Sequence, residues 1–316
     1  MKTKHLIAMS SLLCLFNSTA FAASDAFCER YAQKSVAQDL RNMANECNFS
    51  GLRWSANFID QKKWCKTVRE SIASNETKVR NDKLVSCGVV PDAPINWSNA
   101  PFMLTYDTIP GIVVRRAEAN DVGSLQVYKR EGISLSADWF GNFGTALFHA
   151  IGKQAEQSVH YLINFDNPNR TSNAGPNPLA NLLRNDQVNY RLLHFLLQNG
   201  SKPNSAGESQ TDSNIPLTLA VQKKDLRAVK ELLHVGQADP NYYFDTPVLI
   251  TALKNRSHDI ALQLIYKGAK VNDNGEGCHS PLPLDLALSM NDGALIYTIR
   301  RKGGKTAAQC LADGGS

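Results

Sequence analysis

The chain has seven cysteines and seven histidines. Both residue types can ligate a metal or take part in catalysis, and cysteines can also form disulfides. Cys14 lies in an apolar N-terminal stretch. None of the others has the C-x₂-C spacing of a zinc site, and the N-terminal group lacks neighbouring histidines. An even set of six in an exported chain favours disulfides over metal ligation. These six are Cys28, Cys47, Cys65, Cys87, Cys278 and Cys310.

The histidines have no sequence context that would make a catalytic site. The chain contains no H-E-x-x-H motif, no G-x-S-x-G nucleophile elbow, no G-x-x-x-x-G-K phosphate loop and no G-x-G-x-x-G fingerprint. His149 lies near the start of an apolar helix, where we expect its ring to bond the turn backbone. We therefore predict no enzymatic activity, no cofactor and no metal ion.

The first 22 residues have the pattern of a cleavable export signal. Lys2 and Lys4 precede an apolar run from Leu6 to Phe16, and Ala20-Phe21-Ala22 gives a small-x-small cleavage site. A lipoprotein modified at Cys14 is the competing interpretation, but Leu13 is too bulky for the position before such a cysteine. We expect a soluble periplasmic protein beginning at Ala23. The formal net charge of +5 is too small for a nucleic-acid-binding stripe.

A pattern of helix pairs recurs through the rest of the chain. Each unit has a short apolar helix, a second helix with paired leucines or isoleucines, and a stop residue. Ile215-Pro216-Leu217-Thr218-Leu219-Ala220, Leu232-Leu233 and Gly236 illustrate one unit, and Gly236 is expected to close its helix in the left-handed conformation. The stops recur every 32 to 36 residues, at Gly132, Asp166, Gly200, Gly236, Gly268 and Gly303.

This region resembles the ankyrin-repeat family, whose period is about 33 residues with a turn and two helices per repeat. The resemblance covers about six repeats between residues 110 and 306, of which the first looks like a capping repeat. It implies an all-α solenoid of helix pairs with hairpin or loop tips. It also implies a protein partner, because a solenoid presents its tips and inner helices as one extended surface.

Residues 23–90 are expected to form a small disulfide-linked helical domain ahead of the solenoid. Helices are predicted over 26–44, up to Trp64-Cys65, and over 66–87. If the first and third helices are antiparallel, the disulfides are Cys28–Cys87 and Cys47–Cys65, although four cysteines allow three connectivities. The cysteine spacing is similar to that of a helical module of exported bacterial proteins. Trp54 and Trp64 are expected to pack its small core.

Two further segments flank the solenoid. Residues 91–109 read as a linker that Trp97, Phe102 and Tyr106 fasten to the first repeat, because prolines interrupt any helix there. Residues 307–316 read as a C-terminal tail. A Cys278–Cys310 disulfide is expected to pin the last repeat, where a solenoid frays most easily.

The tips suggest where a partner binds. Large aromatic side chains give contact area at a low entropy cost and are enriched at interface hot spots, although each ring could instead pack on the neighbouring tip. The candidates are Trp139, Phe140, Arg170, Tyr242, Tyr243 and Phe244.

Export, a rigid surface and no catalytic motif favour an immunity or inhibitor protein that neutralises a toxin, such as a secreted lipase or cell-wall hydrolase. The alternatives are an accessory factor that stabilises a resident periplasmic enzyme, such as an antioxidant enzyme, and a ligand sensor.

Overall fold

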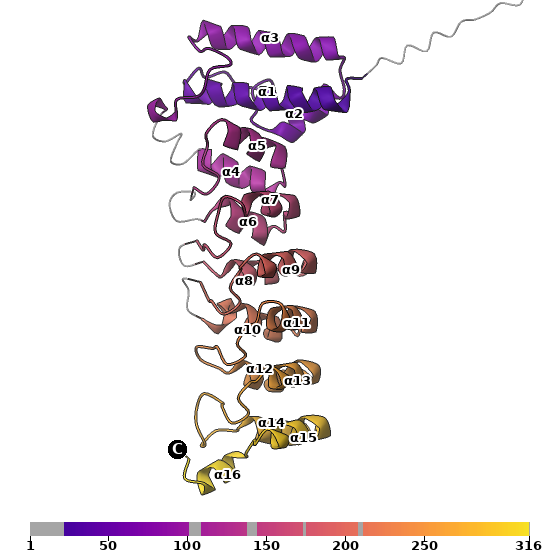
Figure 1. Ribbon diagram of the computed structural model, residues 1–316, viewed down its shortest axis with the longest axis vertical. Coiled ribbons are helices and arrows are strands. Elements are labelled where there is room, and N and C mark those ends of the chain that lie inside the picture. The colour runs from indigo at the N-terminus through magenta and orange to yellow at the C-terminus, as the bar shows by residue number, and fades with distance from the viewer. Residues whose placement is uncertain (1–21, 101–108, 138–143, 173–174, 208–210, 316) are drawn as a thin grey trace, which may run out of the picture.

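The computed structural model describes residues 22–100, 109–137, 144–172, 175–207 and 211–315, and Figure 1 shows a long stack of helices with an N-terminal module at one end. The module consists of α1 (Asp25–Ala44), α2 (Phe58–Cys65) and α3 (Glu70–Ser86). A short 3-10 helix, η1 (Trp97–Asn99), follows. The leader predicted over residues 1–22 lies outside the described residues, except for Ala22.

Among the described residues, six antiparallel helix pairs follow the module, with one further helix after the last pair, and they confirm the predicted all-helical solenoid. Each pair has an inner helix followed by an outer helix. The inner helices are α4 (Ile109–Glu118), α6 (Ala146–Gly152), α8 (Pro178–Leu183), α10 (Pro216–Gln222), α12 (Val248–Lys254) and α14 (Pro283–Ser289). The outer helices are α5 (Val122–Arg130), α7 (Glu156–Leu162), α9 (Tyr190–Gln198), α11 (Leu226–His234), α13 (His258–Tyr266) and α15 (Gly293–Arg301).

The apolar residues of the repeat pattern form one continuous core through these pairs. In the fourth pair, Leu217 and Val221 of α10 face Val229 and Leu232 of α11, and all four are at most 1% exposed. Most outer helices begin at an Asp or Asn N-cap that accepts a backbone N–H, as Asp225 does from Ala228 at 2.9 Å. The recurring sequence pattern therefore encodes both the helix starts and the buried face.

Glycines end most outer helices in the left-handed conformation, but Gly236 does not. Gly132, Gly200, Gly268 and Gly303 have φ values between +81° and +94°. After α11 the left-handed residue is instead Gln237, at φ +52°. Our prediction for Gly236 was wrong because this turn is one residue longer. Glycine still fits best at 236, since a Cβ there would lie 2.9 Å from the Leu232 carbonyl oxygen.

The disulfides of the N-terminal module differ from our prediction. The bonds are Cys28–Cys65 and Cys47–Cys87, not Cys28–Cys87 and Cys47–Cys65. Helices α1 and α3 are parallel, because the chain returns through residues 45–57 and α2 to the start of α1 before α3 begins. Ser24 Oγ accordingly donates to Glu70 Oε1 at 2.9 Å at that end. Both helices then end at the same side, where Cys47 and Cys87 meet.

The module packs directly on the first repeat rather than standing apart from it. Ala32, Val36 and Leu40 of α1 and Phe58 of α2 belong to the same apolar core as α5. Two buried side chains of α5 bond the backbone just before α2. Tyr128 Oη donates to the Ala56 carbonyl at 2.8 Å, and the Phe58 N–H donates to Ser124 Oγ at 3.0 Å. Burial raises the pKa of Tyr128 far above its ordinary value, so its hydroxyl remains a donor.

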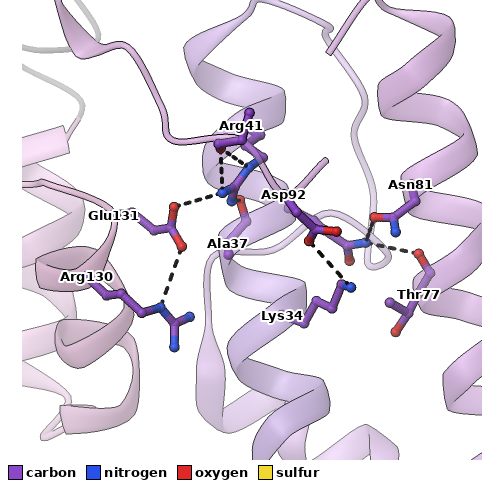
Figure 2. A network of polar contacts seen from close by, with 10 residues as sticks. Lys34, Ala37, Arg41, Thr77, Asn81, Asp92, Arg130 and Glu131 are labelled. Atoms are coloured by element: carbon purple, nitrogen blue, oxygen red, sulfur yellow. Dashed lines mark hydrogen bonds and ion pairs between the residues drawn. The ribbon is translucent and has the colours of Figure 1, made fainter. Parts of the chain in front are cut away.

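The proline-rich segment after α3 lies against α1 and the first repeat. Figure 2 shows Arg41 of α1, which contacts both this segment and Glu131 of the first repeat. The buried Arg41 guanidinium donates through Nη2 to the Ala93 carbonyl at 2.8 Å, and the same nitrogen lies 3.0 Å from Glu131 Oε2. Trp97 Nε1 donates to the Glu131 carbonyl at 2.6 Å. Trp97 therefore fastens this segment to the first repeat, as the sequence suggested. Phe102 and Tyr106 lie outside the described residues.

The C-terminal end carries a helix where the sequence suggested a tail. α16 (Ala307–Ala312) begins at a Thr306 capping box, and its Ala307 N–H donates to Asp285 Oδ2 at 2.8 Å. The structure bonds Cys278 to Cys310, the pairing expected from the sequence. This disulfide fastens α16 to the tip before the last repeat.

Gly123 at the start of α5 tests how closely the module must pack. A Cβ at Gly123 would lie 2.3 Å from Phe58 Cδ1, whereas one at Gly293, at the start of α15, would meet no atom within 4 Å. We expect Gly123→Ala to lower the free energy of unfolding by about 1–3 kcal/mol, as overpacking does. The control Gly293→Ala should raise it by about 0.5–1 kcal/mol. Urea unfolding measures the free energy of unfolding of both variants. Equal effects of the two substitutions would contradict close packing of Phe58 against Gly123.

Candidate protein-binding surface

The tips of the solenoid are the loops between one repeat's outer helix and the next repeat's inner helix. We number the five tips in chain order: 131–145, 163–177, 199–215, 235–247 and 267–282. In Figure 1 the described parts of these tips lie along one side of the stack, beside the inner helices. The third tip contains a 3-10 helix, η4 (Asp212–Asn214).

The fourth tip presents three consecutive aromatic side chains. Tyr242, Tyr243 and Phe244 all come from this tip, and the Tyr242 and Phe244 rings meet edge to face with centroids 5.8 Å apart. Phe244 is 37% exposed, while the two tyrosines are half-buried. The Tyr242 and Phe244 rings thus pack on each other within the tip, and the exposed part of Phe244 leaves apolar area for a partner.

The backbone under these aromatic residues is held by a carboxylate from the third tip. Asp212, which is 9% exposed, accepts N–H groups from Phe244 at 2.7 Å, Asp245 at 3.2 Å and Thr246 at 2.8 Å. Hydrogen bonds to an ionised acceptor are about twice as strong as neutral ones. Asp212 thus fixes the shape of the fourth tip from the preceding repeat.

A second carboxylate holds the same tip from the other side. Tyr243 Oη donates to Asp273 of the fifth tip, at 3.1 Å to Oδ1 and 3.2 Å to Oδ2. Burial, followed by this hydrogen bond, raises the pKa of Tyr243. Three successive tips are therefore linked, and the aromatic residues sit at the middle one.

Arg170 lies two tips away from the aromatic cluster. Its Nη1 donates to the Ser136 carbonyl of the first tip at 2.9 Å and lies 3.7 Å from Asp166 Oδ1. The side chain is 42% exposed. The bond to Ser136 thus links the first and second tips. Trp139 and Phe140, the other predicted contact residues, lie outside the described residues.

Asparagines form a second set of links between tips that our sequence reasoning missed. Asn241 Nδ2 donates to the Gly268 carbonyl at 3.1 Å, while its Oδ1 accepts the Lys270 N–H at 2.8 Å. Asn169 makes the same pair of bonds to Gly200 and Lys202. Asn272 makes them to Gly303 and Lys305. Asn204 accepts the Asp239 N–H. An asparagine three to five residues after four of the six stops was the available signal.

Three of the described histidines lie against carboxylates of neighbouring repeats. His149 Nδ1 lies 3.1 Å from Glu118 Oε1, and His194 Nδ1 lies 2.9 Å from Glu231 Oε2. His258 similarly meets Asp292, the N-cap of α15. Among the described residues, no cluster of three or more His, Cys, Asp or Glu could hold a metal ion.

Comparison with known proteins identifies the central repeats. Residues 183–275 match the family described as ankyrin repeats (3 copies). The human ASB11 ankyrin repeat domain, a solved structure, is similar at 18% identity and a TM-score of 0.46, covering 62% of this chain and 89% of that one. No curated protein matches the chain. The stretch 183–275 is thus built of ankyrin repeats, which imply a protein–protein interaction role and are typically non-enzymatic scaffolds.

Replacing Asp212 tests whether carboxylates hold the aromatic tip. Asp212→Ala removes three backbone hydrogen bonds, so we expect hydrogen exchange at residues 244–246 to become roughly tenfold faster or more, since an unsatisfied buried group costs about 1–3 kcal/mol. Asp186→Ala, at an exposed position of the third repeat, is the control. Unchanged exchange at 244–246 in Asp212→Ala would show that the tip keeps its shape without this carboxylate.

Proposed function

From the ankyrin repeats at residues 183–275, we propose that this chain is a periplasmic protein that binds another protein through the tips of its solenoid. More specifically, we propose that it is an immunity or inhibitor protein whose partner is a toxin entering the periplasm, such as a secreted lipase or a cell-wall hydrolase. The observation that carries the proposal is the fourth tip, whose backbone at residues 244–246 and Tyr243 side chain are held by the neighbouring tips.

The proposed location is supported by the leader pattern and by the cysteines. All six cysteines after the leader are paired in disulfides. Such bonds persist in oxidising compartments and are rare in a reducing cytosol. Within the described part of the chain, no helix combines the length and apolar character needed to cross a membrane.

The geometry of the fourth tip favours tight binding. An interface gains affinity when its contact groups need no ordering upon association. Asp212 and Asp273 hold the backbone of this tip and the Tyr243 ring in place, and Phe244 remains 37% exposed. Tip residues can therefore form a compact aromatic contact at a low entropy cost. A protein that acts by blocking its target needs this kind of surface and no catalytic group of its own.

A periplasmic pull-down with the tagged mature chain tests this function. We expect one stoichiometric protein to be captured, and the Tyr242→Ala/Phe244→Ala double variant to bind it roughly 30-fold more weakly or worse, as loss of about 2 kcal/mol at a hot spot implies. Tyr243 is left intact because it anchors the tip. Tyr266→Ala/Tyr297→Ala is the matched control, since these tyrosines are 66% and 62% exposed on outer helices.

The identity of the captured protein separates the proposed roles. A toxin encoded beside the gene, together with greater sensitivity of the deletion strain to attack by its kin, supports the immunity role. Capture of a resident enzyme would instead identify an accessory factor. Equal binding by the wild type and the double variant, with loss in the outer-helix control, would contradict binding through the fourth tip.

A further inference from the structure

The N-terminal module contains a pocket that the protein-binding role does not use. It has a volume of about 430 Å³ and lies between α1, α2, α3 and the loop before α2. Small-molecule sites typically measure roughly 300–1,000 Å³ and combine aromatic walls with a few convergent polar groups. The pocket lies at the module end of the stack, beyond the first repeat, whereas the aromatic tip is in the fourth loop.

Two aromatic rings line the apolar side of this pocket. The Tyr31 and Trp64 ring centroids are 5.3 Å apart with an angle of 36° between the planes. We expected Trp64 to be a core residue, but it is 37% exposed, whereas Trp54 is 8% exposed and stacks on Phe49. Leu52, which also lines the pocket, is 99% exposed. The pocket therefore offers apolar surface that no other part of the described chain covers.

The polar side of the pocket is built around a buried arginine. The Arg80 side chain is 1% exposed, and its Nη2 donates to Gln61 Oε1 at 2.9 Å and to Tyr31 Oη at 3.3 Å. Burial lowers the pKa of Arg80. Its Nη1 has no hydrogen-bond acceptor within the described chain. Burying a guanidinium costs more than packing an apolar side chain would, so stability does not account for its presence.

The charges around the pocket compensate one another. Glu76 Oε1 lies 2.6 Å from Arg53 Nε and 3.4 Å from Arg80 Nε. Asp60 accepts the side-chain amide of Asn57 at the start of α2. Two arginines and two carboxylates thus line the pocket, and their formal charges sum to zero. The pocket therefore has no net charge that would attract an ionic ligand of either sign.

We propose that this pocket binds a neutral saccharide. A sugar ring has an apolar face that can lie against the exposed part of Trp64, which Tyr31 supports from behind, and hydroxyl groups that both donate and accept hydrogen bonds. The Ser55 hydroxyl, the Gln61 amide and the half-exposed Arg53 guanidinium can bond these hydroxyls, while the absence of net charge disfavours anionic and cationic ligands. This site is distinct from the solenoid tips and does not depend on the role proposed for them.

Calorimetric titration of the oxidised mature chain tests the proposal. The neutral probes are N,N′,N″-triacetylchitotriose and maltotriose, and the charged probes are glutamate and spermidine. We expect at least one neutral saccharide to bind and both charged probes to fail. Trp64→Ala should weaken binding roughly tenfold or more, as loss of a large aromatic contact does. Ile72→Ala is the control, because Ile72 is 50% exposed on α3 outside the pocket.

Circular dichroism establishes that each variant is folded. Should Trp64→Ala fail to fold, Arg53→Ala replaces it, since this pocket side chain is 44% exposed. Binding only of glutamate or spermidine, binding of no probe, or saccharide binding that survives the pocket substitution would overturn the proposal. Loss of the captured protein partner in the pocket variant, without saccharide binding to the wild type, would also overturn it and assign the pocket to a partner's side chain.

Discussion

The first helix pair of the solenoid has an apolar face that must be covered, and the rest of the structure depends on how this is done. A repeat cannot bury its hydrophobic face alone, so the ends of a solenoid need caps. At the C-terminal end, α16 and the Cys278–Cys310 bond hold the last repeat. At the N-terminal end, α1 and α2 cover α5, and Phe58 fills the space above Gly123. The N-terminal module therefore acts as a cap on the solenoid.

Polar contacts fix the orientation of this cap. The bond from Tyr128 to the Ala56 carbonyl and the contact between Arg41 and Glu131 are both buried, and a buried polar group without a partner is costly. They therefore define one arrangement of module and repeat. Along the stack the same principle recurs, because Asp212 and the asparagines satisfy backbone groups of the next tip. Such links join the cap to the aromatic tip, one repeat after another.

The sequence predicted the repeats well because most carry their own local signals: a short apolar helix, a second helix with paired leucines or isoleucines, and a stop residue. It failed where a result depended on distant segments. The disulfide pairing followed from α3 running parallel to α1, which is decided by the path of residues 45–57 and α2. Gly236 failed because one extra residue moved the left-handed position to Gln237.

The candidate site was only partly predictable for the same reason. Tyr242, Tyr243 and Phe244 are adjacent in sequence, so their grouping was visible. Asp212 lies 32 residues before Phe244, and only the stacking of repeats brings its carboxylate under the tip. The pocket in the module joins Tyr31, Gln61 and Arg80 from three different helices. No local pattern in the sequence connects these three residues.

Native-state hydrogen exchange of the oxidised mature chain in increasing urea tests most directly whether the module is part of the solenoid. Amides that open in one cooperative unit share the same free energy of opening and the same dependence on denaturant. The structure predicts that the amides of α1 and α2 open together with those of α4 and α5. Opening of α1 and α2 at low urea, while α4 and α5 remain fully protected, would contradict the account and show that the module is a separate domain.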